Sequence, residues 1–135
     1  MKQTQAFLST YTADVSGVCS ALFELGGMTV MHDASGCNST YNTHDEPRWY
    51  DMDALVFISG LSELEAVLGD DEKLIEDTVR AAKELSPRFI ALAGTPIPMI
   101  TGCDLAAIAR EIESRSGVPS FFVPLVLELS VPSKW

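Results

Sequence analysis

Short apolar runs alternate with longer amphipathic segments along this sequence, and this alternation restricts the possible folds more than any other feature. The apolar runs are candidate strands and lie at residues 28–33, 53–60, 88–94 and 119–125. The run at 53–60 is almost continuously apolar, as expected of a strand that is covered on both faces. Strands separated by helices of this length predict a parallel sheet with right-handed crossovers. We therefore expect a single three-layer, Rossmann-like α/β domain over residues 1–135, in which helices flank a mainly parallel sheet.

The amphipathic segments carry helical periodicity and recognisable helix ends. Their apolar stripes are Val15, Val18, Cys19 and Leu22, then Leu74, Ile75, Val79, Ala82 and Leu85, and finally Leu105, Ile108, Ala109 and Ile112. Ser62 and Glu65 have capping-box spacing for a further short helix, and Gly117 is placed to end the last one. Two prolines punctuate residues 95–102, so a loop rather than a regular helix is expected there.

Composition excludes several classes of protein. A length of 135 residues with 47% hydrophobic content suffices for one packed domain, with residues 1–14 as an arm and 125–135 as a tail. The net charge of -10 argues against nucleic acid as a partner, because phosphate backbones require clustered Lys and Arg. No apolar stretch approaches the length of a membrane span, so no membrane partner is expected. The N-terminus lacks a continuous apolar core of the secretory type, which favours a cytoplasmic location.

The loops that follow the strands hold the candidate functional residues. Ligands of such sheets bind beyond the carboxyl ends of the strands, where the segments "HDASGCNST", "SGLSELE" and "GTPIPMITGCD" leave. The first and the third carry Cys37 and Cys103. Three cysteines, an odd number, make a closed disulfide framework improbable. Neither a GxGxxG fingerprint nor a phosphate-binding loop motif is present in the sequence, which disfavours a dinucleotide or ATP site.

Four motifs in order give the chain a resemblance to a known family. Cys19 precedes a strand, and residues 32–37 form an "HGPxGC"-like turn. Residues 67–74 are similar to a "VFGGExKL" segment, and residues 95–105 to a "CPxxxIGDDI" loop. Together these motifs resemble the N-terminal domain of the nitrogenase component 1 family. That family includes molybdenum-iron protein subunits, cofactor-assembly scaffolds and dark-operative protochlorophyllide reductase subunits.

The resemblance implies an oxidoreductase component with an iron–sulfur cluster at a subunit interface. The cluster would receive electrons from an ATP-dependent iron protein and pass them to a cofactor or substrate. Carried over residue by residue, Cys19 and Cys37 match two cluster ligands of the family. Thr95 stands where the third cysteine belongs, and Cys103 lies eight residues later, so Cys103 is a substitute only if the loop folds back. A C2 homodimer, or a heteromer with a related subunit, would supply further thiolates, and four of them suit a [4Fe–4S] cluster.

Each candidate residue also has a structural interpretation. Cys19 lies on an apolar helix stripe, where burial is an alternative to ligation. Cys37 lies in a polar turn, which favours ligation. Cys103 precedes a predicted helix, whose dipole would lower the thiol pKa, but it could equally fill a tolerant turn position. His32 is expected to hydrogen-bond the turn that presents Cys37, and Gly36 to allow close backbone approach.

The length of the chain leaves two functional alternatives open. Family members normally have three related α/β domains, so this chain would be either a truncated N-terminal domain or a module that works with partners. The alternative to a redox role is a non-redox scaffold, or a module that binds a cofactor or partner and has lost the cluster. A flavodoxin-like regulatory domain is a third possibility, disfavoured because no phosphate-binding turn is visible.

Overall fold

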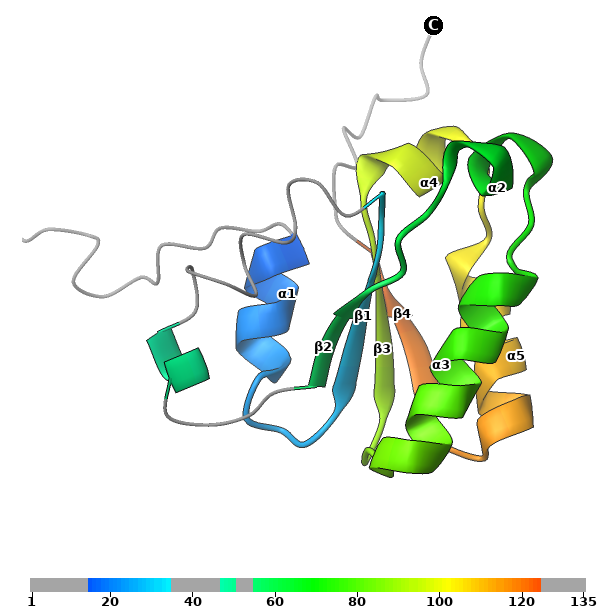
Figure 1. The fold of residues 1–135 in the computed structure, drawn as a ribbon. Helices are drawn as coiled ribbons and strands as arrows, with labels where there is room; N and C mark the ends of the chain where they lie inside the picture. The colour runs from blue at the N-terminus through cyan, green and yellow to red at the C-terminus, as the bar shows by residue number, and fades with distance from the viewer. Residues whose placement is uncertain (1–14, 35–46, 51–54, 125–135) are drawn as a thin grey trace, which may run out of the picture.

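The computed structural model describes residues 15–34, 47–50 and 55–124 (Figure 1). Its elements in chain order are α1 (Val15–Leu22), β1 (Met28–His32), the 3-10 helix η3 (Pro47–Tyr50), β2 (Leu55–Ile58), α2 (Glu63–Leu68), α3 (Glu72–Leu85), β3 (Ile90–Gly94), α4 (Pro96–Ile100), α5 (Leu105–Ser116) and β4 (Ser120–Val123). The predicted arm at 1–14 and tail at 125–135 lie outside the described residues, as do Gly36, Cys37 and His44.

The described strands form one parallel sheet in the order β2-β1-β3-β4. The central pair is in register from Met28 opposite Ile90 to His32 opposite Gly94. In Figure 1, α1 covers one face of this sheet, whereas α3 and α5 cover the other. The predicted three-layer, Rossmann-like α/β architecture with a parallel sheet is therefore confirmed.

Alternating strand residues divide the core into two clusters, one on each face. The larger cluster joins Met28, Val30, Ile90 and Leu92 to the buried stripes of α3 and α5. The smaller cluster joins Met31, Val56 and Ala93 to Val15 and Cys19 of α1. The strand period of two sends neighbouring residues to opposite faces, so β1 and β3 contribute to both clusters. Within the described part of the chain, no helix is long and apolar enough to cross a bilayer.

Two expectations about burial are wrong at the margins of the core. Leu85 was assigned to the buried stripe of α3, but it is 43% exposed. It is the last residue of that helix, and the chain turns away at Ser86 in the left-handed conformation. The second strand was expected to be covered on both faces, yet Phe57 of β2 is 38% exposed. The reason is that β2 lies at the edge of the sheet, with β1 as its neighbour on one side.

The proline-containing segment after β3 is helical, which corrects the predicted loop. Pro96 is the first residue of α4 and Pro98 is the third. The N–H groups of a first helical turn have no partner within the helix, so prolines at these positions cost no hydrogen bond. The amide of Thr101 donates to the carbonyl of Ile97 at 3.2 Å, so the short helix continues into the turn that follows it.

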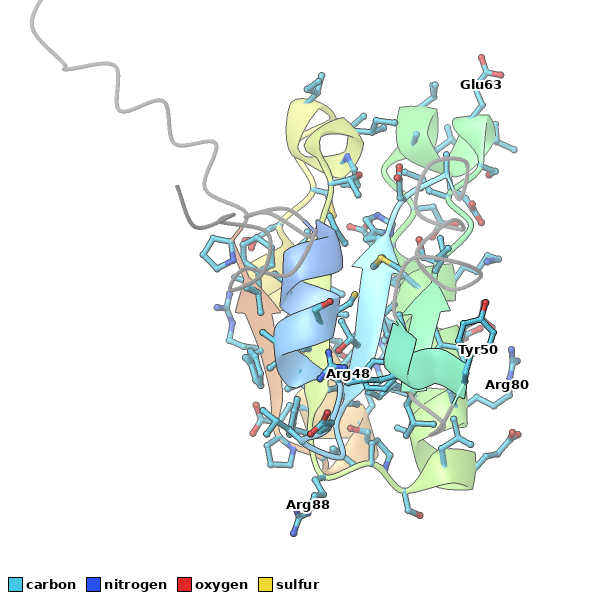
Figure 2. The ribbon with its side chains drawn as sticks, turned by 90° about the vertical axis from the view of Figure 1, so that its left-hand side faces the viewer. Arg48, Tyr50, Glu63, Arg80 and Arg88 are labelled. Carbon is cyan, nitrogen blue, oxygen red and sulfur yellow. The ribbon has the colours of Figure 1, made fainter. Side chains whose placement is uncertain are left out.

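The ends of α2 and α5 agree with the sequence, and Arg48, which the sequence did not single out, contacts the end of α1. The Ser62–Glu65 capping box is present, and Gly117 ends α5 in the left-handed conformation, as expected. Arg48 of η3 lies over the end of α1, as Figure 2 shows. Its guanidinium donates to the carbonyl of Ser20 at 2.8 Å and lies 4.7 Å from the centroid of the Phe23 ring. A cation at a helix C-terminus is favourable because it meets the carbonyl end of the helix dipole.

We predict that Gly94→Ala lowers the free energy of unfolding by about 1–3 kcal/mol, the usual cost of overpacking a core. A methyl group at this position would lie 2.4 Å from Cδ1 of Leu105, where α5 crosses the end of β3. Urea denaturation of Gly94→Ala, of Leu105→Val and of the double variant measures the effect. Shortening Leu105 should recover part of the loss, so the double variant should lose less stability than the sum of the two single variants. If the losses in unfolding free energy of the two single variants simply add in the double variant, contact with Leu105 is not the cause of the effect at Gly94.

Candidate functional site

The ends of three parallel strands meet at the carboxyl edge of the sheet. His32 ends β1, Ser59 follows β2, and Thr95 follows β3. The segment after β2 runs alongside the end of β1, because the amide of Ser59 donates to Met31 at 2.9 Å and the amide of Leu61 donates to Asp33 at 2.8 Å. This is the edge at which the sequence placed the ligand-binding loops.

His32 is held in one orientation by the hydroxyl of Ser59. Its Nδ1 lies 2.8 Å from the Ser59 Oγ, and only 3% of the residue is exposed. The same hydroxyl accepts from the amide of Asp33 at 3.2 Å and donates to the Asp33 carbonyl at 3.3 Å. The Ser59 hydroxyl thus joins the imidazole Nδ1 to the backbone of Asp33 and orients the ring. Burial lowers the pKa of His32 below 6.5, against the opposing effect of the Asp71, Asp33 and Glu65 carboxylates.

Asp71 lies at the start of α3, but its carboxylate does not cap that helix. The residue occupies the N-cap position in a helical conformation and makes no side-chain cap hydrogen bond. The neighbouring Asp70 accepts from the amide of Glu72 at 3.2 Å instead. At the start of α5 the situation is the usual one, because Asp104 accepts from the amide of Ala107 at 2.9 Å.

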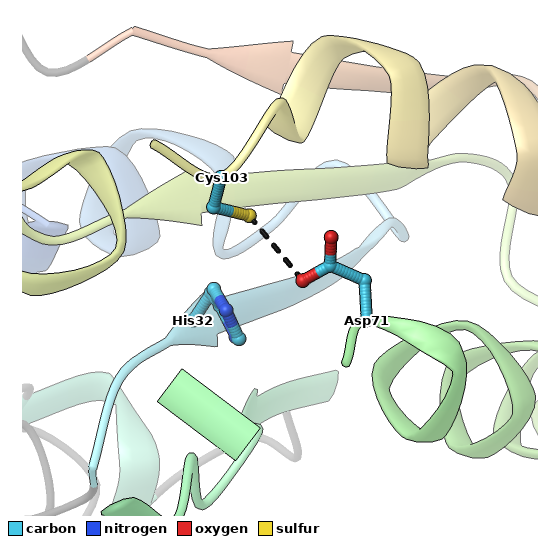
Figure 3. A group of neighbouring side chains, drawn as sticks. All are labelled: His32, Asp71 and Cys103. Carbon is cyan, nitrogen blue, oxygen red and sulfur yellow. Dashed lines mark hydrogen bonds between the residues drawn. The ribbon is translucent and has the colours of Figure 1, made fainter. Parts of the chain in front are cut away.

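Cys103 completes a group of three side chains, shown in Figure 3. The chain turns after α4 through Gly102 in the left-handed conformation, and the Cys103 amide donates to the carbonyl of Pro98 at 3.0 Å. The thiol then donates to Oδ1 of Asp71 at 3.6 Å. The ligand atoms of Cys103, Asp71 and His32 all lie within 4.8 Å of one another.

The environment of Cys103 opposes the dipole effect expected from sequence. Burial raises the pKa of the thiol to about 12, and the Asp71 and Asp104 carboxylates act in the same direction. The two nearby negative charges and the desolvation outweigh the dipole of the helix that follows. Of the two interpretations of Cys103, this environment disfavours a thiol activated by the helix N-terminus.

The other predicted site residues lie elsewhere or have another role. Cys19 is completely buried on α1, where it packs with Met31 and Ala93 on the opposite face of the sheet from the cluster that Cys103 contacts. Thr95 is also buried, and its hydroxyl donates to the carbonyl of His32 at 3.2 Å. Cys37, with Gly36, falls outside the described residues, so the expected contact between its turn and His32 stays a prediction.

Two residues of the site were missed at the level of sequence. A favourable charge at a helix N-terminus would account for the position of Asp71 in the sequence, but not for the direction of its carboxylate. Ser59 begins the segment "SGLSELE", which the sequence places among the candidate ligand-binding loops, but no role of its own is predicted for it. A polar residue directly after an apolar strand in a parallel sheet is the signal that could have identified Ser59.

Comparisons with known proteins agree with this fold. The sequence model of the family described as "Nitrogenase component 1 type Oxidoreductase" matches residues 14–133. A nitrogenase molybdenum-iron protein beta chain from Methanothermobacter thermautotrophicus is 28% identical over 109 residues, which cover 79% of this chain and 24% of the relative. The solved structure "Nitrogenase Cp1 at pH 6.5" is similar with a TM-score of 0.66 at 18% identity, over 83% of this chain and 24% of that one. Another, "Nitrogenase Cp1 at pH 5", has a TM-score of 0.64 at 19% identity, over 84% and 23%. The chain thus spans about a quarter of the length of these relatives.

We predict that the buried imidazole of His32 makes the metal-free protein less stable in mild acid. Its folded-state pKa lies below the unfolded value of 6.5, so the unfolded chain binds more protons as the pH falls through that value. The free energy of unfolding should therefore decrease from about pH 7.5 to about pH 5.5, by at most about 1.4 kcal/mol per pH unit. Urea titrations across this range measure it. His32→Gln should flatten the dependence, whereas His44→Gln should retain it, and the reverse result would contradict the assignment.

Proposed function

Since this chain belongs to the nitrogenase component 1 type oxidoreductase family, we propose that it is a domain or component that holds an iron–sulfur cluster at a subunit interface. In this proposal it works in the cytoplasm and relays electrons from an ATP-dependent iron protein to a bound cofactor or substrate. The family match over residues 14–133 supports the oxidoreductase relation. The ligands, the electron donor and the acceptor are the proposed parts.

The observation that carries the proposal is the position of Cys19 below the carboxyl edge. Cys19 packs with Met31 and Ala93, which immediately precede the last residues of β1 and β3. Cys37 follows His32 by five residues in the segment that leaves β1 at that same edge. Cys19 thus lies beside the ends of β1 and β3, and Cys37 is close to the end of β1 in sequence. Thiolates are the protein ligands that iron–sulfur clusters require.

Thr95 does not fit the third ligand position of the family. A hydroxyl is a poor ligand for soft iron, and this one already donates to the carbonyl of His32. Cys19 and Cys37 therefore give two thiolates per chain, and a C2 dimer with both loops at its axis would give the four that a [4Fe–4S] cluster takes. When bound, such a cluster supplies a one-electron carrier. This chain's part is to provide the thiolates and to exclude water from Cys19, which is completely buried.

Exposed apolar side chains support an interface at the carboxyl edge. Both α2 and α4 lie beyond the carboxyl ends of the strands in Figure 1. Their exposed large hydrophobic residues, here called the apolar edge patch, are Leu64, Val67, Leu68, Ile97 and Ile100. Exposed apolar side chains on two helices at the same end of the sheet are candidates for a protein contact. A second copy of this chain, or a related subunit, is the proposed occupant.

A non-redox scaffold is the second candidate function. It is favoured by the complete burial of Cys19 among apolar side chains, which is an ordinary environment for a structural cysteine. The hydrogen bond of Thr95 favours it too. At the position where the family has its third cysteine ligand, this side chain instead bonds the residue after β3 to the end of β1. In this role the same edge would hold a cofactor or a partner without a cluster.

We predict that anaerobic reconstitution with iron and sulfide loads a cluster that depends on Cys19 and Cys37. Iron and acid-labile sulfide counted per chain should fall to background in Cys19→Ser and in Cys37→Ser, and should be retained in Cys103→Ser. Thr95→Cys should raise the iron content above that of the parent, because it restores a thiolate where the family has one.

The same measurement separates the two functions. Loss of the cluster in all three serine variants would make Cys103 a ligand and contradict the proposed pair. A parent chain that loads no cluster, together with a Thr95→Cys variant that does, would favour the scaffold. Circular dichroism of each variant shows whether a loss of iron reflects a loss of fold.

We also predict that the apolar edge patch forms the subunit contact. Val67→Glu and Ile100→Glu should weaken self-association, each by roughly tenfold, because a buried contact residue is commonly worth 1–2 kcal/mol. Leu85→Glu is the matched control, since Leu85 is also exposed but is the last residue of α3, a helix that ends at the amino end of the sheet in Figure 1. Sedimentation velocity over a concentration series measures the dissociation constant. Equal weakening by the control, or a monomeric parent, would contradict this interface.

A further inference from the structure

We propose that His32, Asp71 and Cys103 form a binding site for a divalent transition metal of the zinc type. The site uses neither Cys19 nor Cys37 as a ligand, and it does not depend on the proposed redox function. Its three ligands come from three segments: the end of β1, the start of α3 and the turn after α4. Figure 3 shows the three side chains pointing toward one another.

The spacing of the ligand atoms is close to that of a tetrahedral site. Bonds of about 2.0–2.3 Å from zinc to nitrogen, oxygen and sulfur place the ligand atoms roughly 3.3–3.7 Å apart. Sγ of Cys103 and Oδ1 of Asp71 are already 3.6 Å apart. The whole set lies within 4.8 Å, so closure onto a metal requires a side-chain movement of about one ångström and no change of fold.

The chemistry of the ligands selects the metal. Calcium and magnesium take all-oxygen sites, whereas one imidazole, one carboxylate and one thiolate suit zinc or cobalt. An iron–sulfur cluster would need more thiolates than this group offers. Asp71 and Cys103 are only partly buried, so the fourth position faces the solvent side of the group. Three protein ligands with one open position are the arrangement of metal sites that bind water or a substrate.

Two features of the surroundings prepare the group for a metal. The hydroxyl of Ser59 lies 2.8 Å from Nδ1 of His32 and orients the imidazole, which is the role that a supporting hydrogen bond has in metal sites. Asp71 does not use its carboxylate on the helix it begins, although Asp104 does so at the start of α5. The carboxylate faces the thiol instead.

Titration of the metal-free full-length chain with Co²⁺, followed by displacement with Zn²⁺, tests the proposal. Parent protein should bind one Co²⁺ per chain and show the thiolate-to-cobalt charge-transfer absorption together with intense tetrahedral d–d bands. Cys103→Ser should lose the charge-transfer band, and Asp71→Asn should bind at least about tenfold more weakly. Asp70→Asn is the matched control, because Asp70 is the adjacent acid and bonds to the amide of Glu72; it should bind like the parent. Ser59→Ala should weaken binding about tenfold or more while it leaves all three ligands in place.

Further variants distinguish this site from the proposed cluster ligands. The charge-transfer band should persist in Cys19→Ser and Cys37→Ser, whether or not the chain loads iron and sulfide. A band that persists in Cys103→Ser and disappears in Cys37→Ser would overturn the proposal. The same holds for equal weakening by Asp70→Asn and Asp71→Asn, or for a parent that binds no Co²⁺. Circular dichroism and the midpoint of thermal unfolding confirm that each variant is folded.

Discussion

The parallel pairing of β1 with β2 on one side and β3 on the other determines where the chemistry of this chain gathers. Parallel strands bring their carboxyl ends to one edge, and the registers at Met31–Ile58 and His32–Gly94 make these ends almost level. Side chains that are distant in sequence therefore meet: Ser59 bonds to His32, and Thr95 bonds to the backbone of His32. The proposed functions depend on this edge, because His32 ends β1 there and Cys19 packs against the last residues but one of β1 and β3.

The fold could be predicted from sequence because its signals are local. The stripes of α3 and α5 follow from the helical period, and the Ser62–Glu65 cap follows from a spacing of three residues. The wrong predictions concern residues whose burial or secondary structure depends on their place in the assembled fold. Phe57 is exposed because β2 is an edge strand, and strand order cannot be read from the apolar run itself. The helix α4 was not predicted, because proline usually interrupts a helix. Its two prolines, however, lie in the first turn, where proline is tolerated.

The site could be predicted only in part, since its members are defined by tertiary approach. His32 and Cys103 were identified because imidazole and thiol groups are rare and their loops follow strands. From sequence alone, Asp71 is an acid at the start of a helix. Only the packing of α3 against the sheet shows that its carboxylate faces Cys103. The pKa of Cys103 illustrates the same limit. A helix dipole is a local property, whereas the burial and the two carboxylates that reverse its effect come from the assembled fold.

The two faces of the sheet keep the sulfur chemistry of this chain apart. Cys19 belongs to the cluster under α1, whereas Cys103 packs against the cluster under α3 and α5. A cluster that used both thiols would have to be reached from both faces around the ends of β1 and β3, where Thr95 now fastens the backbone of His32. The proposed cluster ligand Cys19 and the proposed metal site of His32, Asp71 and Cys103 are compatible, because neither needs a ligand of the other.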